Sequence, residues 1–355
     1  MAITFGVEEE FMLLDPVTLA PVDGAPSALG RLDDRGHDGI VSGEFLRSQV
    51  EYATPVCETM AEAREALLGF RRSLARWAAD AGVVAAGTGT PPAGPAVATI
   101  SDGERYSQIS DEAAGLTHEH QISGLHVHVG VDREYGVHAS NALRGWLPVL
   151  LALSGNSPFW RGQDTGYDSW RAIHSRRWTT FGIPPLFRDV DDYDATAAAL
   201  IGIGATADVR SLNWNVRLSA VHPTVEVRVC DAQLDAGTSV ALAIVIRALV
   251  DSAQDLAASS APERTPWDAA LWHAARHGLR GRLVHPLTGR LAPVTTVVDA
   301  LHDRVRPHLH GEHEGQAVAR LLGGARCGAT QQRAARRGGM PALADLYRGQ
   351  LVRDA

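Results

Sequence analysis

The stretch Thr4-Phe5-Gly6-Val7-Glu8-Glu9-Glu10-Phe11-Met12-Leu13-Leu14 places three consecutive carboxylates inside a run that is otherwise typical of a buried strand. Side chains alternate along a strand, so Glu8 and Glu10 share one face and Glu9 lies on the other. Two carboxylates about 7 Å apart on one face suit divalent cations with oxygen ligands. An exposed edge strand with a solvated acidic face is the alternative. The rest of the sequence decides between these interpretations.

The composition limits the partners and the compartment. The chain has 355 residues, 45% of them hydrophobic, and a net charge of −8 from 33 basic and 41 acidic residues. It has no polybasic run, which argues against a nucleic-acid or membrane partner. Three scattered cysteines without a Cys-x-x-Cys pair argue against a disulfide framework or a zinc site, and they fit a reducing cytoplasm. The most apolar window, residues 240–250, is short and carries Arg247, so we predict no membrane span.

Hydrophobic periodicity predicts strands and helices in one α+β domain over residues 1–355, because no linker divides the chain. A capping box at Thr59 opens a helix that Gly82 closes. The segment 156–185 is a long loop rich in Trp, Arg, Gly and Tyr, which is typical of a functional region. Residues 16–40 are predicted to be loop-rich. The other predicted strands are 49–54, 83–86, 124–131, 212–217 and 224–229, and the other predicted helices are 141–153, 239–258 and 341–351.

Three of these strands also carry polar groups on one face. His126 and His128 alternate with apolar residues between two glycines, so both imidazoles project from the same side of the strand. Glu226 and Arg228 repeat the arrangement, and Glu51 stands in an otherwise apolar strand. The alternatives are a hydrogen-bonded structural histidine and a solvated cross-strand ion pair.

Four strands with charged or imidazole groups against an apolar back face are better explained by one site than by four solvated faces. Oxygen ligands with one or two imidazoles favour magnesium or manganese over zinc. Neighbouring arginines suit a phosphate-bearing substrate. We therefore predict a sheet whose concave face collects Glu8, Glu10, Glu51, His126, His128, Glu226 and Arg228, with Glu9 structural and paired behind it.

Several sequence blocks, in order along the chain, resemble the signature of the carboxylate–amine ligase family, the type 2 glutamate–cysteine ligase-like proteins. They are Gly6-Val7-Glu8-Glu9-Glu10-Phe11, Ser48-Gln49-Val50-Glu51, Gly124-Leu125-His126-Val127-His128-Val129-Gly130, Asn156-Ser157-Pro158-Phe159-Trp160 with Asp164-Thr165-Gly166-Tyr167, and Pro223-Thr224-Val225-Glu226-Val227-Arg228. The resemblance implies the glutamine synthetase-like catalytic fold, in which an antiparallel sheet curves into a funnel with helices outside. It also implies ATP-dependent joining of a carboxylate, typically the γ-carboxylate of glutamate, to an amine such as that of cysteine or another amino acid.

Carried over position by position, the resemblance implies roles for eight residues. His128 would lie near the nucleotide phosphates, and Arg217 and Arg228 would steady the transferred phosphoryl group and so act in catalysis and ATP binding. The implied cofactors are ATP and Mg²⁺, or Mn²⁺. The implied metal ligands are Glu8, Glu10, Glu51, His126 and Glu226.

The sequence departs from the family pattern at two places. Asn215 stands where the family has an aspartate, and Leu218 where it has a proline. In the long loop, Thr179-Thr180-Phe181 replaces the usual Pro-Thr-Ala. These differences leave the reaction class standing but put cysteine as the acceptor in doubt.

The expected reaction has two steps, phosphorylation of the carboxylate by ATP and attack of the amine on the acyl phosphate. The expected partners are small molecules, and a homo-oligomer is compatible with the sequence, which does not determine the oligomeric state. A metal-dependent amidohydrolase acting on γ-glutamyl amides is one alternative, because His and Glu clusters also activate water. A non-catalytic protein that binds nucleotide or amino acid is the other.

Overall fold

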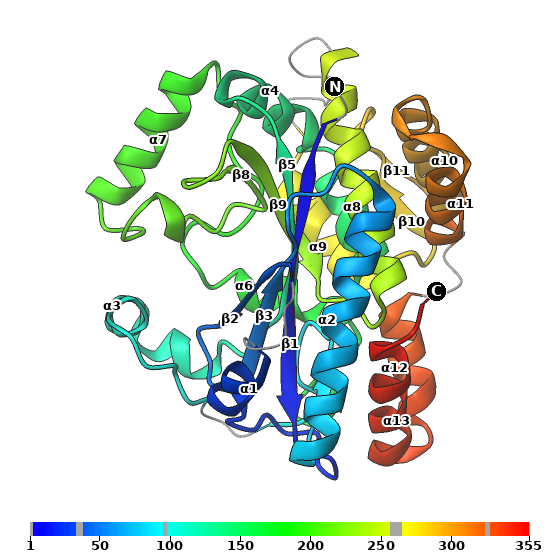
Figure 1. The fold of residues 1–355 in the computed structure, drawn as a ribbon. Helices are drawn as coiled ribbons and strands as arrows, with labels where there is room; N and C mark the ends of the chain where they lie inside the picture. The colour runs from blue at the N-terminus through cyan, green and yellow to red at the C-terminus, as the bar shows by residue number, and fades with distance from the viewer. Residues whose placement is uncertain (1–2, 33–37, 95–97, 256–264, 324–326, 355) are drawn as a thin grey trace.

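A seven-stranded antiparallel sheet forms the centre of the molecule (Figure 1). The computed structural model describes residues 3–32, 38–94, 98–255, 265–323 and 327–354. The sheet has the order β2-β3-β1-β5-β9-β8, and β4 pairs with the end of β1. The strands are β1 (Phe5–Leu14), β2 (Ile40–Gly43), β3 (Gln49–Ala53), β4 (Val84–Ala86), β5 (Gly124–Gly130), β8 (Val216–Leu218) and β9 (Thr224–Asp231).

The ten-residue strand β1 is the central strand because it is long enough to pair with three neighbours. Its first half pairs with β5, its middle with β3 and its last three residues with β4. Phe5, Val7, Phe11 and Leu13 alternate onto one face and are buried in the main core. This face is the one that the long helices cover.

The helices α2 (Met60–Ala81) and α8 (Ala236–Asp251) pack on this apolar face of the sheet (Figure 1). The capping box at Thr59 begins α2 and Gly82, with φ of 69°, ends it, as predicted. Among the described residues, Ala236–Asp255 is a helix long and apolar enough to cross a membrane by length and composition. However, 83% of its apolar window is buried inside the fold, as in the core helix of a folded domain.

Glu9 points into this helical layer, away from Glu8 and Glu10. Its carboxylate forms a bidentate ion pair with Arg71 of α2, at 2.6 and 2.8 Å, and accepts a further hydrogen bond from Ser239 of α8. Arg71 also donates to the carbonyl oxygens of Gln233 and Leu234, both at 3.0 Å. Both charged side chains are buried, so the expectation that Glu9 is paired behind the sheet is confirmed.

The remaining elements surround the sheet, with α3 and α7 on the flank opposite α10–α13 (Figure 1). They are α1 (Ala25–Leu32), α3 (Glu104–Ala113), η2 (Ala114–Glu119), α4 (Arg133–Leu143), α5 (Leu147–Ser154), β6 (Phe159–Trp160), β7 (Gln163–Asp164), α6 (Trp170–Ser175), α7 (Val190–Gly202), η3 (Val209–Ser211), η4 (Ser252–Asp255), α9 (Trp267–His277), β10 (Arg282–Val284), β11 (Leu291–Pro293), α10 (Val294–Val305), η5 (Arg306–His308), α11 (Gly311–Leu322), α12 (Gly328–Arg336) and α13 (Gly339–Leu351).

The predicted helix over residues 141–153 is wrong, because the chain forms two helices there, α4 and α5, with a break at residues 144–146. Pro148 has no N–H to donate to the carbonyl of Arg144, and its ring would clash with that carbonyl in a continuous helix. Gly145 occupies the break, where a Cβ would come within 3.0 Å of the Pro286 carbonyl oxygen. The helix α4 begins at Arg133, where Asp132 caps it through the Tyr135 N–H.

Three other boundaries differ from the predictions. The strand predicted over 212–217 is only Val216–Leu218, and the loop-rich segment 16–40 contains α1 and the start of β2. The helix predicted from 239 begins at Ala236, and its predicted end at 258 lies outside the described residues. The other predicted strands agree with the structure to within two residues. Cys57 and Cys230 are buried free thiols in the hydrophobic core.

We predict that Arg71→Met lowers the free energy of unfolding by about 3–5 kcal/mol, because it leaves the buried Glu9 carboxylate without its counter-charge. Denaturant unfolding measures the change. The matched control is Arg64→Met, which removes an ion pair with Asp354 whose side chains are 44% and 42% exposed. The control should cost less than about 1 kcal/mol. Equal stabilities of the two variants would contradict the importance of the Glu9–Arg71 pair.

Candidate active site

The register of the sheet brings the predicted polar residues into one row on the face opposite Glu9. Glu10 lies opposite Glu51 of β3, and Glu8 lies opposite His126 of β5. On the other side of β5, His128 lies opposite Glu226 of β9, and Glu226 lies opposite Arg217 of β8. Side chains that are directly opposite on antiparallel strands are neighbours, so the row is continuous across the sheet.

Glu8 connects the two histidines. Its carboxylate oxygens lie 3.2 Å from His126 Nδ1 and 3.2 Å from His128 Nε2. His126 Nε2 also lies 3.7 Å from the Glu10 carboxylate. His128 Nδ1 lies 2.9 Å from the hydroxyl of Thr224, which orients the second imidazole.

Glu226 is held by both predicted arginines. Arg217 Nε donates to it at 2.8 Å, and Arg228 forms a second ion pair with it. A β-bulge between the Leu125 and Val127 pairs gives β9 an extra residue in the stretch that includes Arg228. Bulges re-aim side chains and are frequent beside active sites. The Glu226 carboxylate is therefore fixed next to the histidines by positive charge.

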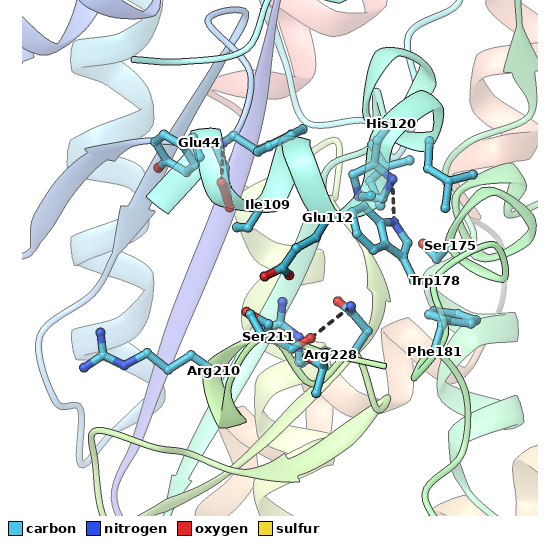
Figure 2. Close-up of a pocket in the computed structure, with 18 of the residues that line it drawn as sticks. Glu44, Ile109, Glu112, His120, Ser175, Trp178, Phe181, Arg210, Ser211 and Arg228 are labelled. Atoms are coloured by element: carbon cyan, nitrogen blue, oxygen red, sulfur yellow. Dashed lines mark hydrogen bonds between the residues drawn. The ribbon is translucent and has the colours of Figure 1, made fainter. Parts of the chain in front are cut away.

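A cavity of about 600 Å³ opens onto part of this row of side chains (Figure 2). The other predicted residues, Glu8, His128, Arg217 and Glu226, are not among those that line it. Glu10, Glu51, His126 and Arg228 line its floor. Figure 2 shows Glu44, the residue after β2, on the same cavity, although no sequence pattern predicted a role for it. A volume of this size is typical of a small-molecule site.

The carboxylates at the β3 end of the row resist ionisation. Burial and the nearby Glu44 raise the pKa of Glu10 to about 8. Burial raises the pKa of Glu51 well above its ordinary value, and the charges of Glu44, Glu8 and Glu10 add to the effect. Burial also raises the pKa of Glu44. Buried carboxylates that repel one another in this way form a site that a divalent cation would stabilise.

The groups at the β9 end have the opposite character. Burial opposes ionisation of Glu8, but its hydrogen bonds to His126 and His128 outweigh this and hold the pKa of Glu8 well below its usual range. Burial likewise disfavours ionised Glu226, but Arg228 and Arg217 lower its pKa below the ordinary value. Burial and Arg228 lower the pKa of His126 to about 4, so this imidazole is neutral and able to bind a metal.

The donor set fits magnesium or manganese. The His128 imidazole supports this, because its buried Nε2 lies between two carboxylates, 3.2 Å from Glu8 and 3.9 Å from Glu226. Carboxylates and imidazoles that converge in this way offer the oxygen and nitrogen ligands that a divalent cation takes. Three groups of side chains have candidate ligand atoms within 4.8 Å of one another: Glu8 with His128 and Glu226, Glu8 with Glu51 and His126, and Glu10 with Glu44 and Glu51.

Part of the cavity wall comes from the long segment 156–185, whose composition is typical of a functional region. Trp178 Nε1 donates a 2.9 Å hydrogen bond to His120 Nδ1 (Figure 2). Burial lowers the pKa of His120 to about 3, so the imidazole is neutral and carries its proton on Nε2. Thr179 and Phe181, which depart from the family pattern, also line the cavity. Asn215 lines it too, and its Oδ1 is buried without a partner.

Comparison with known sequences identifies the family of the protein. Residues 4–349 match the family described as glutamate-cysteine ligase family 2. A protein of Saccharopolyspora erythraea named "Putative glutamate--cysteine ligase 2-2" is 40% identical over 350 residues, covering 96% of this chain and 90% of that protein. One of the same name from Mycobacterium sp. (strain KMS) is 38% identical over 342 residues, covering 94% and 93%.

Solved structures share the fold. A glutamate–cysteine ligase from Francisella tularensis in complex with AMP has a TM-score of 0.73 at 13% identity, covering 100% of this chain and 90% of that one. A bifunctional glutathione synthetase from Pasteurella multocida has a TM-score of 0.70 at 15% identity, covering 98% and 52%. The predicted α+β fold class, with an open antiparallel sheet and helices outside, is confirmed.

These sequence matches define the class of protein as a ligase. More specifically, the chain belongs to the glutamate–cysteine ligase family 2, so the resemblance inferred from the ordered sequence blocks is confirmed.

The structure brings together all eight residues that were singled out from the sequence. Glu8, Glu10, Glu51, His126, His128, Glu226, Arg217 and Arg228 form the continuous row described above. Their roles stay predictions. Sequence reasoning missed Glu44, which follows a short unrecognised strand, and Arg171, which lies in the long segment whose composition already indicated function.

We predict that Glu10→Gln weakens Mn²⁺ binding by more than about tenfold, the lower limit found even for outer-shell partners of a metal. Glu9→Gln should leave the Mn²⁺ affinity of the folded protein close to that of the wild type, because Glu9 faces α2. Electron paramagnetic resonance of free Mn²⁺ measures both affinities. If Glu9→Gln lost the metal while Glu10→Gln retained it, the assignment of the two faces would be reversed.

Proposed function

We propose that the protein joins the γ-carboxylate of glutamate to the amine of a second amino acid, using ATP and Mg²⁺ or Mn²⁺. The observation that supports this most strongly is the row of overlapping carboxylate and imidazole clusters, of which Glu10, Glu44, Glu51 and His126 line a cavity of about 600 Å³. Membership of the glutamate–cysteine ligase family 2 supports the reaction class. The departures at Asn215 and Phe181, both on the cavity, leave the acceptor open between cysteine and other amino acids.

The reaction is proposed to run in two steps. In the first, a carboxylate oxygen of glutamate attacks the γ-phosphorus of ATP, the bond between that phosphorus and the β–γ bridging oxygen breaks, and ADP leaves. In the second, the amine nitrogen attacks the acyl carbon, the C–N bond forms, inorganic phosphate leaves and the nitrogen loses a proton. Positioning and charge neutralisation dominate such phosphoryl transfers.

The proposed metal ligands are Glu8, Glu10, Glu51, His126 and Glu226, joined by Glu44, which shares a cluster with Glu10 and Glu51. A bound divalent cation would neutralise phosphate charge and lower the cost of gathering these carboxylates. His128 has its Nε2 facing the Glu8 and Glu226 carboxylates, which supports a role beside the nucleotide phosphates.

Arg217 and Arg228 are proposed to stabilise charge on the transferred phosphoryl group. Their pairing with Glu226 keeps both guanidinium groups fixed at the edge of the row. Fixed positive groups stabilise developing charge without having to reorganise during the reaction. We also keep as predictions a single catalytic domain over residues 1–355 and a cytoplasmic location.

A coupled assay of ADP release tests the proposal. With glutamate, Mg²⁺ or Mn²⁺ and a panel of amino acids, we expect ADP formation that depends on both the carboxylate and the amine. Absence of amine-dependent ADP formation across the panel would refute the ligase proposal. Cleavage of a γ-glutamyl amide without ATP would instead indicate an amidohydrolase, and tight ATP binding without turnover would indicate a binding protein.

We predict that Glu226→Gln reduces turnover by at least about 100-fold, since loss of one preorganised charged group in an active site typically costs this much. Circular dichroism should show an intact fold, because the amide keeps the shape of the side chain and its oxygen can still accept from Arg217. Steady-state kinetics of ADP formation measure the effect. Activity within a few-fold of the wild type would remove Glu226 from the proposed metal site.

A further inference from the structure

Arg171, in the short helix α6, is a buried arginine on the wall of the cavity. Its side chain is only 6% exposed. The two terminal nitrogens donate long hydrogen bonds to main-chain carbonyl oxygens, 3.2 Å to Arg228 and 3.4 Å to Val229, and its Nε has no partner. Within the described part of the chain, no carboxylate forms an ion pair with Arg171.

The other arginines around the cavity differ from Arg171 in this respect. Arg105 pairs with Asp208 at 3.1 Å, Arg177 pairs with Glu119 at 2.8 Å, and Arg228 pairs with Glu226. Arg210 is exposed to solvent and extends away from the cavity (Figure 2). Arg171 is therefore the buried cation on this cavity that lacks a contacting counter-charge among the residues described.

The nearby acid Asp231 is engaged elsewhere. Its carboxylate accepts from the Ser157 hydroxyl at 2.6 Å, the Ser169 hydroxyl at 2.8 Å and the Asn156 N–H at 2.9 Å. The Ser157 hydroxyl in turn accepts from the main-chain N–H of Arg171, at 3.0 Å. Asp231 thus holds the start of α6 in place rather than contacting the guanidinium.

Gly124 allows Arg171 to lie close to the proposed metal ligands. A Cβ at this position would be 2.5 Å from Arg171 Nη2. The N–H of the same glycine donates to the Glu10 carboxylate at 2.7 Å. The Arg171 guanidinium therefore lies beside the glycine that hydrogen-bonds to Glu10, at the edge of the row of carboxylates.

We infer that Arg171 binds a carboxylate of an amino-acid substrate that does not react, either the α-carboxylate of the donor or the carboxylate of the acceptor. A buried guanidinium without a contacting counter-charge is unfavourable, and its planar group of donors matches a carboxylate in a two-point contact. Bound there, the substrate presents its reactive end toward the carboxylate row. The inference rests on the proposed function, because it assigns substrate recognition to the same cavity.

The first experiment compares wild-type protein and Arg171→Gln in calorimetric titrations with glutamate and with 4-aminobutyrate, which lacks the α-carboxylate. A parallel arm compares cysteine with cysteamine. We expect the wild type to prefer the full amino acid by about 10–100-fold in one arm, the range for a hydrogen-bonded charge, and Arg171→Gln to lose that preference. The arm that responds identifies the donor or the acceptor as the source of the carboxylate.

The matched control is Arg133→Gln, which removes an exposed arginine paired with Asp194 and should preserve the discrimination, because neither residue lines the cavity. Arg171→Lys keeps the charge but not the planar donors, so it should show a smaller preference than the wild type. It replaces Arg171→Gln in both titrations if the glutamine variant does not fold. Undiminished discrimination in both arms by the folded Arg171 variants, or no preference in the wild type, overturns the inference.

The same substrate pairs are then compared in the ADP assay. We expect Arg171→Gln to raise KM for the full amino acid far more than it lowers kcat. Failure of the wild type to form ADP would refute the proposed ligase function, whereas the calorimetric preference would still decide the role of Arg171. The two proposals therefore fail on different measurements.

Discussion

The buried ion pair between Glu9 and Arg71 determines which face of the central strand carries the chemistry. Because side chains alternate along β1, pairing Glu9 with α2 forces Glu8 and Glu10 onto the opposite face. A slip of one residue would put two carboxylates into the apolar layer and one into the cavity. Arg71 also contacts the carbonyls of Gln233 and Leu234, just before α8, so the same side chain ties β1 to both long helices.

The opposite face gathers more negative charge than the protein alone can compensate. Arg217 and Arg228 neutralise the β9 end, where the pKa of Glu226 is lowered. At the β3 end Glu10, Glu44 and Glu51 have raised pKa values because burial and mutual repulsion oppose their ionisation. This asymmetry is what a site for divalent cations requires, because the missing positive charge is supplied on binding. Burial of the apolar helical layer behind the sheet stabilises the fold and offsets the unfavourable energy of the clustered carboxylates.

Much of this arrangement was predictable from sequence because it depends on local alternation. Glu8, Glu10, His126, His128 and Glu226 each lie in a strand whose period of two is plain. Glu44 was not predictable, since β2 is only four residues long and lies in a segment rich in glycine and aspartate.

Arg171 could not be predicted either. Its significance lies in the lack of an ion pair with any described carboxylate, and only the folded structure shows which charged groups are paired. The break between α4 and α5 is a different kind of error. The prediction of one helix over 141–153 relied on the spacing of apolar residues. Pro148 lacks an N–H and is a local signal for a break in that helix, which the structure shows at residues 144–146.

The proposed acyl phosphate forms on the γ-carboxylate of the substrate glutamate, and transfer of a carboxylate oxygen to phosphate is its most direct signature. Glutamate labelled with ¹⁸O in its γ-carboxylate is incubated with ATP, Mg²⁺ and an accepted amine, and the released phosphate is analysed by mass spectrometry. We expect one ¹⁸O atom per phosphate, because the carboxylate oxygen that attacks phosphorus leaves with it. Unlabelled phosphate formed together with the amide product would rule out the acyl phosphate.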